Sequence, residues 1–283
     1  MQGWTRWTGE KVIKRPRHDT MLPTPSTDHV DFERIYEPAE DSYLLLDTLS
    51  LDTERSFLAS RFPDDVSSPT PLVLEVGTGS GVVLSFIHAH AGTLFGGRNG
   101  NGCDGVLTLG VDVNSFACIA TAKTISIAQE TQAAQGLNHG FYLGSITSDL
   151  TSALRPGQID VLVFNPPYVP TPELPRIPER RDDRKTTTFD EDSHLLELSY
   201  AGGEDGMETT DRLLDELPGI LSRRGCAYVL LCAQNKPEGV KERIRGWGRG
   251  WEAETVGRSG KLGGWEKLVV IRIWRDDGDG DAE

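Results

Sequence analysis

The stretch Val161-Leu162-Val163-Phe164-Asn165-Pro166-Pro167-Tyr168 decides the fold. Its four consecutive apolar residues predict a strand that is buried on both faces, as in a parallel sheet. The two prolines then end the strand, because neither can donate a hydrogen bond to a neighbouring strand. The stretch therefore predicts a stiff loop at the carboxyl end of a buried strand, which is where open α/β sheets bind ligands.

The same loop carries groups that suit a planar NH2 group. The side-chain oxygen of Asn165 and the carbonyl of Pro166 can accept its two hydrogens, and the ring of Tyr168 can cover its face. Taken alone, an Asn-Pro-Pro sequence more often marks an ordinary turn at the end of a strand. Both interpretations stay open until the rest of the chain is considered.

A second strand and loop lie upstream. Residues 72–76 predict a short buried strand, and Gly77-Thr78-Gly79-Ser80-Gly81 separates it from an apolar helix that extends to about residue 91. Glycines at alternate positions let the backbone turn tightly and approach a ligand in front of a helix N-terminus. The GxGxG spacing departs from the dinucleotide pattern GxGxxG, so an ordinary glycine-rich turn remains the alternative.

Acidic residues are predicted to lie along the same edge of the sheet. Glu75 precedes the glycine-rich loop, and Asp112 ends a strand predicted over residues 107–111, where an acid typically binds ribose hydroxyls. Asp149 follows a weak strand predicted near residues 141–146, and there it can accept the exocyclic amine of an adenine. For Asp149, a helix N-cap is the alternative interpretation.

Strands and helices alternate over the first two-thirds of the chain, which predicts a doubly wound parallel sheet. Helices are expected at about 38–51, 115–134, 208–221 and 238–247, and further strands at 227–232, 251–256 and 267–274. The last two strands have no helix between them and are expected to form an antiparallel pair. Residues 52–71 are expected to be a linker. The charged stretch from 168 to 194 is expected to be irregular and to cover the Asn165 site.

A single domain is expected over residues 35–275. Residues 1–34 contain prolines at positions 16, 23 and 25 and no sustained apolar period, which predicts a largely disordered extension with the natural start at Met21. The acidic tail, residues 276–283, is expected to be disordered. Residues 92–105 contain six glycines and predict a flexible surface insertion.

The composition excludes several function classes. The formal net charge is −14, whereas a protein that grips duplex nucleic acid through its phosphates needs a basic face. The four cysteines are scattered without a CxxC pair, so neither a disulfide framework nor a zinc site is expected. No apolar run is long enough to span a bilayer, and no secretory signal is recognisable. The expected location is the cytoplasm, with the nucleus as an additional location left open.

Together, these motifs resemble those of class I S-adenosylmethionine-dependent methyltransferases. Within that class, the chain is similar to the HemK-type glutamine methyltransferases that modify peptide release factors. Tyr36-Glu37-Pro38-Ala39-Glu40-Asp41-Ser42 and Ala201-Gly202-Gly203-Glu204-Asp205-Gly206 resemble the eukaryotic and archaeal branch. The resemblance covers roughly residues 21–275, and the chain departs from the family pattern at 92–105 and 173–195.

The resemblance implies a seven-stranded, mostly parallel Rossmann-like sheet with strand order 3-2-1-4-5-7-6, and S-adenosylmethionine as the cofactor. It implies that Ser42, Glu75 and Gly77 lie near the methionine part of the cofactor and that Asp112 holds the ribose. Asp149 and the backbone of Leu150 are implied to flank the adenine. Asn165 is implied to touch both cofactor and substrate. The remaining implied site residues are Gly79 and Gly81 for the cofactor, and Pro166, Pro167 and Tyr168 beside Asn165 for catalysis; no metal is expected.

The implied substrate is the glutamine of the Gly-Gly-Gln motif in a class 1 release factor, methylated on its side-chain nitrogen. An amide nitrogen is a poor nucleophile because its lone pair is delocalised into the carbonyl, so positioning by Asn165 and Pro166 is expected to supply most of the catalysis. An adenine methyltransferase acting on a flipped base is an alternative, since it uses the same type of loop. A protein-lysine methyltransferase and a scaffold that binds cofactor without turnover are the others.

A protein partner is expected at the strand predicted over Phe141–Ile146. In the implied strand order this strand lies at the edge of the sheet, and it contains two aromatic residues, two aliphatic residues and no charge. Natural edge strands usually carry a lysine, a proline or a bulge, and the sequence indicates none here. The resembled eukaryotic family works as a heterodimer with a small zinc-binding activator protein, which we expect to add a strand at this edge. Coverage by the C-terminal tail or by residues 92–105 is the alternative.

Overall fold

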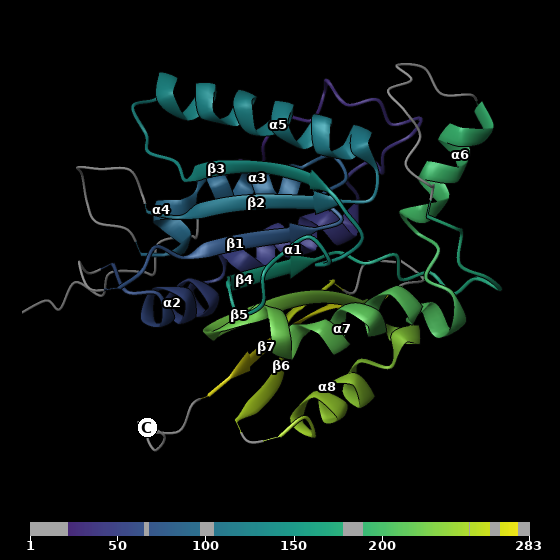
Figure 1. Ribbon diagram of the computed structural model, residues 1–283. Helices are drawn as coiled ribbons and strands as arrows, with labels where there is room; N and C mark the ends of the chain where they lie inside the picture. The colour runs from purple at the N-terminus through teal and green to yellow at the C-terminus, as the bar shows by residue number, and fades with distance from the viewer. Residues whose placement is uncertain are drawn as a thin grey trace, which may run out of the picture.

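The computed structural model describes residues 22–64, 68–96, 105–177, 189–248, 250–260 and 267–276. Its centre is a seven-stranded sheet in the order β3-β2-β1-β4-β5-β7-β6 (Figure 1). The strands are β1 (Leu72–Val76), β2 (Leu107–Asp112), β3 (Phe141–Thr147), β4 (Ile159–Phe164), β5 (Leu221–Cys232), β6 (Trp251–Arg258) and β7 (Leu268–Arg275). Neighbours from β3 to β5 are parallel, and β7 is antiparallel to both β5 and β6. The predicted fold class and strand order are confirmed.

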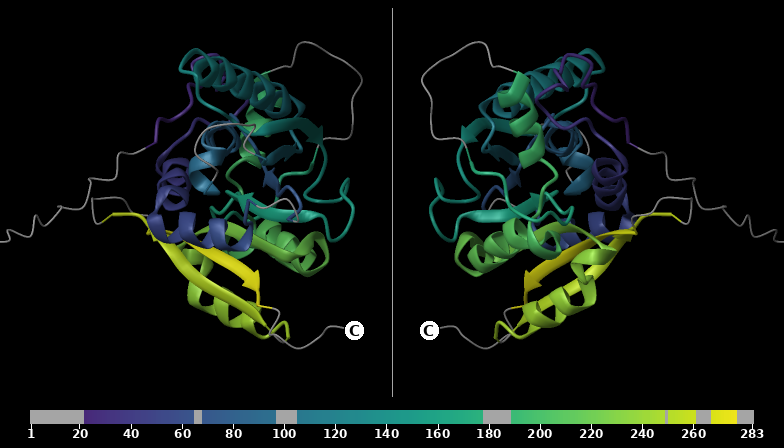
Figure 2. Two further views of the ribbon diagram at one scale, coloured as in Figure 1. Left: turned by 90° about the vertical axis from the view of Figure 1, so that its left-hand side faces the viewer. Right: turned by 90° about the vertical axis from the view of Figure 1, so that its right-hand side faces the viewer.

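Helices cover both faces of this sheet (Figure 2). They are α1 (Glu40–Ser50), α2 (Asp52–Arg61), α3 (Val82–Ala89), α4 (Ala91–Leu94), α5 (Ser115–Ala134), α6 (Phe189–Leu198), α7 (Glu208–Ile220) and α8 (Pro237–Arg245), with short 3₁₀ turns at Glu204–Gly206 and Ala233–Asn235. None of the helices in the described ranges is long and apolar enough to cross a membrane.

Alternate side chains of each central strand point to opposite faces, as the period of a strand requires. In β4, Val161 and Val163 pack with the apolar side chains of α1 to α4, whereas Leu162 and Phe164 pack with those of α7 and α8. Both rows of β4 are therefore buried. This is the pattern that the run of apolar residues before Asn165 predicted.

The prediction that residues 52–71 form a linker is wrong, because residues 52–61 form α2. The helix begins directly after Leu51, and Asp52 and Glu54 lie in its first turn, where carboxylates complement the helix dipole. Leu58 and Glu54 are buried against the rest of the fold. The prolines that suggested a linker all lie beyond the end of this helix.

The irregular stretch predicted from 168 to 194 is wrong in its last part, because α6 begins at Phe189. Residues 178–188 lie outside the described ranges. Before them, Val169 forms an isolated parallel bridge with Ala201, which follows α6. This bridge brings the chain after α6 back to the loop that follows β4.

The predicted extension also differs from the structure, because residues 22–34 lie against the domain. Val30 is buried and packs with Ala120 of α5. The Nε2 atom of His90 lies 2.8 Å from the Pro23 carbonyl oxygen. The prediction of disorder is therefore wrong for this part. Residues 1–21, the core of the glycine-rich insertion (97–104) and the tail from 277 lie outside the described ranges.

Strand β3 lies at the edge of the sheet, as predicted, but it does contain a bulge. Thr108 of β2 is opposite Tyr142 and Leu109 is opposite Gly144, so Leu143 has no partner residue in β2. Gly144 has a φ of 132°, a conformation that L side chains rarely adopt. The expectation of an edge without a bulge is therefore wrong.

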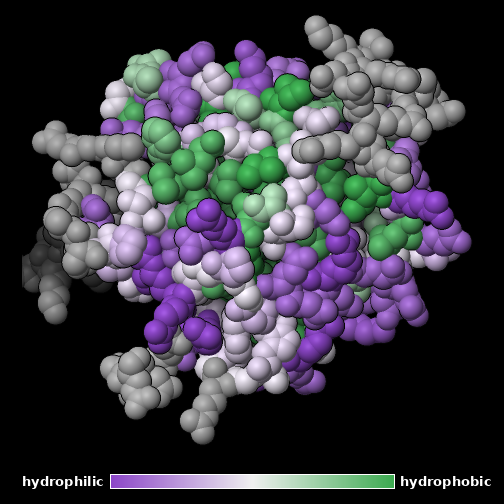
Figure 3. Space-filling view, viewed as in Figure 1, coloured by the Kyte–Doolittle hydropathy of each residue, from purple (hydrophilic) through white to green (hydrophobic). Residues whose placement is uncertain are grey.

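Apolar side chains remain accessible around this edge. Phe141 and Leu143 are 58% and 49% exposed. In Figure 1 no described helix lies in front of β2 and β3 on the side of the sheet that carries α7 and α8. Figure 3 shows hydrophobic side chains gathered over these two strands in the same view. This part of the sheet is thus an exposed apolar surface.

Candidate active site

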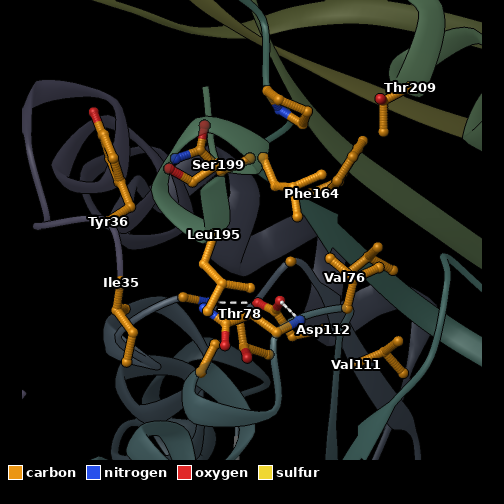
Figure 4. A pocket seen from close by; sticks show the side chains of 18 of the residues that line it. Ile35, Tyr36, Val76, Thr78, Val111, Asp112, Phe164, Leu195, Ser199 and Thr209 are labelled. Carbon is orange, nitrogen blue, oxygen red and sulfur yellow. Dashed lines mark hydrogen bonds between the residues drawn. The ribbon is translucent and has the colours of Figure 1, made fainter. Parts of the chain in front are cut away.

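A cavity of about 240 Å³ opens at the carboxyl ends of β1, β2 and β4 (Figure 4). Most of the residues named from the sequence line it: Ser42, Glu75, Gly77, Gly79, Asp112, Asp149, Leu150, Asn165 and Pro167. They come from α1 and from the ends of four different strands. Gly81, Pro166 and Tyr168 are not part of the lining.

The glycine-rich loop after β1 forms one wall. Gly77 and Gly79 have φ values of 67° and 50°, which favour glycine, and the Gly79 N–H donates a hydrogen bond to Asp112 Oδ2 at 3.0 Å. Gly81 has a different role. A Cβ atom there would lie 2.6 Å from Thr121 Cα, so Gly81 allows α3 to begin directly against α5.

Two buried carboxylates set the electrostatics of the cavity. Burial raises the pKa of Glu75 well above its ordinary value, although the Leu84 N–H, which donates to Oε2 at 2.9 Å, lowers it in part. The nearby charge of Asp112 raises the pKa of Glu75 further. Burial also raises the pKa of Asp112, against the hydrogen bonds from the Gly79 and Asn114 N–H groups. Such a site favours a ligand with a positive charge and hydroxyl groups.

The carboxylate of Asp149 is already bound by another side chain of the protein, which the sequence did not suggest. Its Oδ2 atom accepts a hydrogen bond from Arg212 Nη2 at 2.5 Å, and both side chains are partly exposed. Leu150 beside it is buried with a φ of 45°, which is strained for a residue with a Cβ atom. Strain of this kind clusters at ligand sites, so this corner of the cavity is suited to backbone recognition of a ligand.

The loop after β4 brings an unsatisfied acceptor to the cavity. The Oδ1 atom of Asn165 is buried and accepts no hydrogen bond from the described residues. Tyr168 points elsewhere: its hydroxyl donates to Asp41 Oδ2 at 3.3 Å, and the hydroxyl of Tyr36 donates to the same atom at 3.1 Å. Asp41 is itself buried at the start of α1. The predicted cover by the Tyr168 ring is therefore replaced by an anchor to α1.

A second layer lies over the cavity. Leu195 and Leu198 of α6 line it, together with Leu174 and Ile177 of the preceding segment. Figure 4 shows Leu195 and Ser199 directed toward Asp112 and Phe164. The described parts of the stretch after Tyr168 thus do cover the Asn165 site, as predicted.

Several residues of the site carry no sequence signal of their own. Asp41 was named only as a member of the Tyr36–Ser42 motif, with no role, and Arg212 only lay within a predicted helix. Arg34 lines the cavity and forms an ion pair with Asp192 of α6 at 3.6 Å, although it belongs to the predicted extension. These positions become functional only through contacts between distant parts of the chain. A motif search alone could have found Asp41, which stands inside the Tyr36–Ser42 motif.

The comparisons with known proteins agree with this geometry. No protein-family model matches the chain. It is 31% identical over 258 residues to the eRF1 methyltransferase catalytic subunit mtq2 of Schizosaccharomyces pombe, a match that covers 90% of this chain and 96% of the relative. It is 32% identical to methyltransferase HEMK2 of Mus musculus, over 89% of this chain and 96% of the relative.

Two more distant similarities are also found. A release factor glutamine methyltransferase of Deinococcus radiodurans is 26% identical over 66% of this chain and 55% of the relative. A solved structure of the E. cuniculi Mtq2–Trm112 complex is similar with a TM-score of 0.47 and 23% identity, over 86% of this chain and 99% of that one. The identities to mtq2 and HEMK2 over nearly their whole lengths show that the chain belongs to the HemK-type methyltransferase family.

Proposed function

We propose that the chain transfers the methyl group of S-adenosylmethionine to the side-chain nitrogen of the glutamine in the Gly-Gly-Gln motif of a eukaryotic class 1 release factor. The observation that carries this proposal is the buried Oδ1 atom of Asn165, which has no donor among the described residues and borders the cavity. A substrate amide brings the N–H groups that this oxygen lacks. Relatives named as an eRF1 methyltransferase and a release factor glutamine methyltransferase support the choice of substrate.

The residues of the cavity fit S-adenosylmethionine, which when bound supplies an electrophilic methyl group on a sulfonium. The buried carboxylates of Glu75 and Asp112 suit a cationic ligand with ribose hydroxyls, and the buried Thr78 hydroxyl has no partner among the described residues. Ser42, Glu75 and Gly77 would hold the methionine part and Asp112 the ribose. The Leu150 backbone and Asp149 would flank the adenine.

The chemical contribution of the chain is orientation. Asn165 Oδ1 and the Pro166 carbonyl accept the two amide hydrogens of the substrate and direct the nitrogen lone pair at the methyl carbon. Bound S-adenosylmethionine would supply the methyl carbon, whose bond to sulfur would break as the bond to nitrogen forms, with the electron pair left on the sulfur. The alkylated nitrogen then releases one proton to water, so no strong base is needed beforehand. Preorganisation of this kind contributes several kcal/mol, on the order of that measured for well-oriented intramolecular reactions.

No specific observation favours the other candidate reactions. The net charge of −14 opposes the grip on nucleic acid that an adenine methyltransferase needs. A scaffold without turnover would have no use for the unpartnered oxygen of Asn165. Lysine methylation needs no acceptor pair for two amide hydrogens, so it leaves the loop after β4 unexplained.

The chain is also proposed to work with a small zinc-binding activator subunit that binds along β3. The accessible Phe141 and Leu143 at the sheet edge support this part of the proposal, and so does the exposed apolar surface over β2 and β3. The fission yeast relative is named as a catalytic subunit. The partner would add a strand to β3 by β-augmentation and cover the apolar surface.

Methyl transfer from labelled cofactor to a panel of acceptors tests the proposed function. The panel contains a eukaryotic release factor, the same factor with the motif glutamine replaced by asparagine, a DNA oligonucleotide and a histone. We expect label in the unchanged release factor alone, in the presence of the activator. Label in the DNA or the histone, with none in the release factor, would refute the proposal.

A further inference from the structure

Asn235 lies at the carboxyl end of β5, the strand next to β4 in the sheet. Its side chain is only 2% exposed, and it belongs to the turn Ala233–Asn235 that separates β5 from α8. The Cys232 N–H donates a hydrogen bond to Asn235 Oδ1 at 2.8 Å. This bond fixes which side of the amide is the oxygen, and it leaves the NH2 group to face the neighbouring loops.

The NH2 group of Asn235 joins two segments that are far apart in the sequence. It donates to the carbonyl of Tyr168 at 3.2 Å, to that of Asp205 at 2.9 Å and to that of Gly206 at 3.3 Å. The reversed amide would place an oxygen against these carbonyls, which are all acceptors. The assignment therefore follows from the surroundings, and the side chain acts as a donor to the loop after β4.

Segment 200–206 also packs against the loop after β4 and forms backbone hydrogen bonds with it. The Val169 N–H donates to the Tyr200 carbonyl at 3.0 Å, and the Gly202 N–H donates to the Val169 carbonyl at 2.8 Å. A Cβ atom on Gly206 would lie 2.1 Å from the Tyr168 carbonyl oxygen, and one on Gly202 would lie 2.4 Å from that of Pro167. Only glycine allows this approach without displacing the backbone of the loop.

The two halves of the loop after β4 differ in whether their oxygen atoms accept hydrogen bonds from the protein. The carbonyls of Tyr168 and Val169 accept hydrogen bonds from Asn235 and Gly202. Within the described ranges, Asn165 Oδ1 and the Pro166 carbonyl accept none. The second half of the loop is thus anchored to the protein, and the first half keeps its acceptors for another molecule.

We propose that Asn235 is a positioning residue for methyl transfer: by holding the Tyr168 carbonyl to the Asp205–Gly206 turn, it keeps the acceptors of Asn165 and Pro166 in the productive geometry. This inference rests on the proposed function. Asn235 is not among the residues that line the cavity, so it acts through the backbone of the loop. Misplacement of reacting groups by about 1 Å can lower the rate about 100-fold, so we expect the loss of the Asn235 amide to lower kcat.

The test compares Asn235→Asp and Asn235→Ala with the wild type in complex with its activator. Aspartate keeps the size of the side chain but can donate a hydrogen bond only when it is protonated. At pH 8 we expect both variants to lose about 100-fold in kcat, with the affinity for cofactor unchanged within about threefold. As the pH falls, Asn235→Asp should recover activity relative to the wild type, whereas Asn235→Ala should not.

Gln234→Glu is the matched control, because it adds the same charge one residue earlier at an exposed position. It should retain the kcat and the pH profile of the wild type. Unchanged kcat in Asn235→Ala would overturn the proposal, and so would a parallel loss of kcat and cofactor affinity. If Asn235→Asp does not fold, the comparison of kcat with cofactor affinity in Asn235→Ala decides alone.

Hydrogen exchange separates this inference from the proposed function. In Asn235→Ala, the amides of Tyr168 and Val169 should exchange faster than in the wild type, while those of the glycine-rich loop, residues 77–81, stay unchanged. This readout needs no substrate. A wild type that fails to methylate any Gly-Gly-Gln protein would refute the proposed function, and unchanged exchange at Tyr168 and Val169 would refute the role of Asn235.

Discussion

At the scale of single residues, two buried carboxylates dominate the cavity, and the charge of Asp112 opposes the ionisation of Glu75. Glu75 is 2% and Asp112 8% exposed, and burial raises the pKa of both. Burying these two carboxylates costs folding free energy in the unliganded protein, and a bound ligand offsets that cost. A positively charged ligand would relieve this repulsion, which links the stability of the protein to occupancy of the site.

Asp112→Ala should weaken the binding of S-adenosylmethionine by about 1.5–3 kcal/mol, the scale of hydrogen bonds to a charged group. The loss follows from the proposed contact between this carboxylate and the ribose hydroxyls. Isothermal titration measures it, and Asp215→Ala, at an exposed position on α7, is the control. Equal affinity in the wild type and Asp112→Ala would remove Asp112 from the site.

Glu75→Gln should raise the stability of the unliganded protein at pH 7 to 8. The raised pKa of Glu75 in the folded state means that stability falls as the pH rises from the unfolded pKa of about 4.3 toward the folded value. Glutamine removes this cost and can still accept the Leu84 N–H. A pKa that differs by one between the folded and unfolded states corresponds to about 1.4 kcal/mol of stability, and each kcal/mol to about 2–4 °C in Tm.

Thermal unfolding at pH 4 and pH 8 checks this prediction. The gain in Tm should be present at pH 8 and vanish at pH 4, where the carboxyl group is largely protonated in both states. The same variant should bind S-adenosylmethionine more weakly, since it loses the negative charge of the cavity. A variant that is less stable than the wild type at pH 8 would contradict the assignment of a cost to Glu75.

At the scale of elements, β3 and α6 depart most from an ordinary doubly wound fold. β3 is an edge strand whose bulge at Leu143 exposes apolar side chains, and α6 covers a cavity that the sheet alone would leave open. Both lie where the chain is proposed to meet other molecules: α6 over the substrate entrance, and β3 on the surface proposed for the activator. The proposed binding surfaces thus lie at the edge of the sheet and at the carboxyl ends of its strands.

Replacing Phe141 and Leu143 together by lysine should abolish the complex with the activator, because charges would face an apolar partner. The cofactor pocket should be unaffected, since both residues lie outside it. Co-purification and cofactor titration measure the two effects. Tyr142→Phe is a milder control, because it changes only the hydroxyl bound to Ser145. Undiminished complex formation by the lysine variant would contradict a partner along β3.

The sequence predicted elements well where local pattern and burial agree. β1, β2 and α5 have the expected bounds to within a residue, because buried apolar runs define the two strands and α5 is a long stretch without proline or glycine. β5 begins at Leu221, six residues before the expected start, because polar Ser222, Arg223 and Arg224 hide its first part. Leu221 pairs with β4 there, and the pairing continues from Cys226 to Val229 after an irregularity. α2 was missed because nearby prolines outweighed its weak apolar period.

Site residues, like the elements, could be predicted only where the local sequence pattern determines their position. Asn165, Asp112 and the glycine-rich loop could be identified because they follow strands directly, and parallel strands end at one edge. Arg212 and Asn235 could not, since their roles arise from contacts across 63 and 67 residues of sequence. The ion pair between Arg212 and Asp149 likewise has no sequence signature.

At the scale of the whole molecule, a buried polar network ties α2 to the C-terminal strands. Arg272 of β7 donates to Glu54 Oε1 and Oε2 at 2.8 and 2.7 Å, and the Tyr228 hydroxyl of β5 donates to Oε2 at 2.9 Å. All three side chains are buried. A network of this kind penalises the loss of any one member, because the others stay desolvated.

Arg272→Ala should therefore reduce the free energy of unfolding by about 3–5 kcal/mol, the cost of leaving a buried charge unpaired. The double variant Arg272→Met with Glu54→Gln should recover most of this loss. Urea unfolding measures both, and Arg258→Ala at an exposed position is the control. A loss below about 1 kcal/mol in Arg272→Ala, the scale of surface pairs, would contradict the assignment of a buried network.

The most direct test of the central claim is single-turnover methyl transfer to a Gly-Gly-Gln release factor by Asn165→Ala at saturating S-adenosylmethionine. We expect a rate lower by about 100-fold or more, with cofactor affinity within about tenfold of the wild type, because Asn165 orients the reacting amide. Asn138→Ala, at an exposed asparagine between α5 and β3, should behave as the wild type. A near-normal rate in Asn165→Ala would contradict the account.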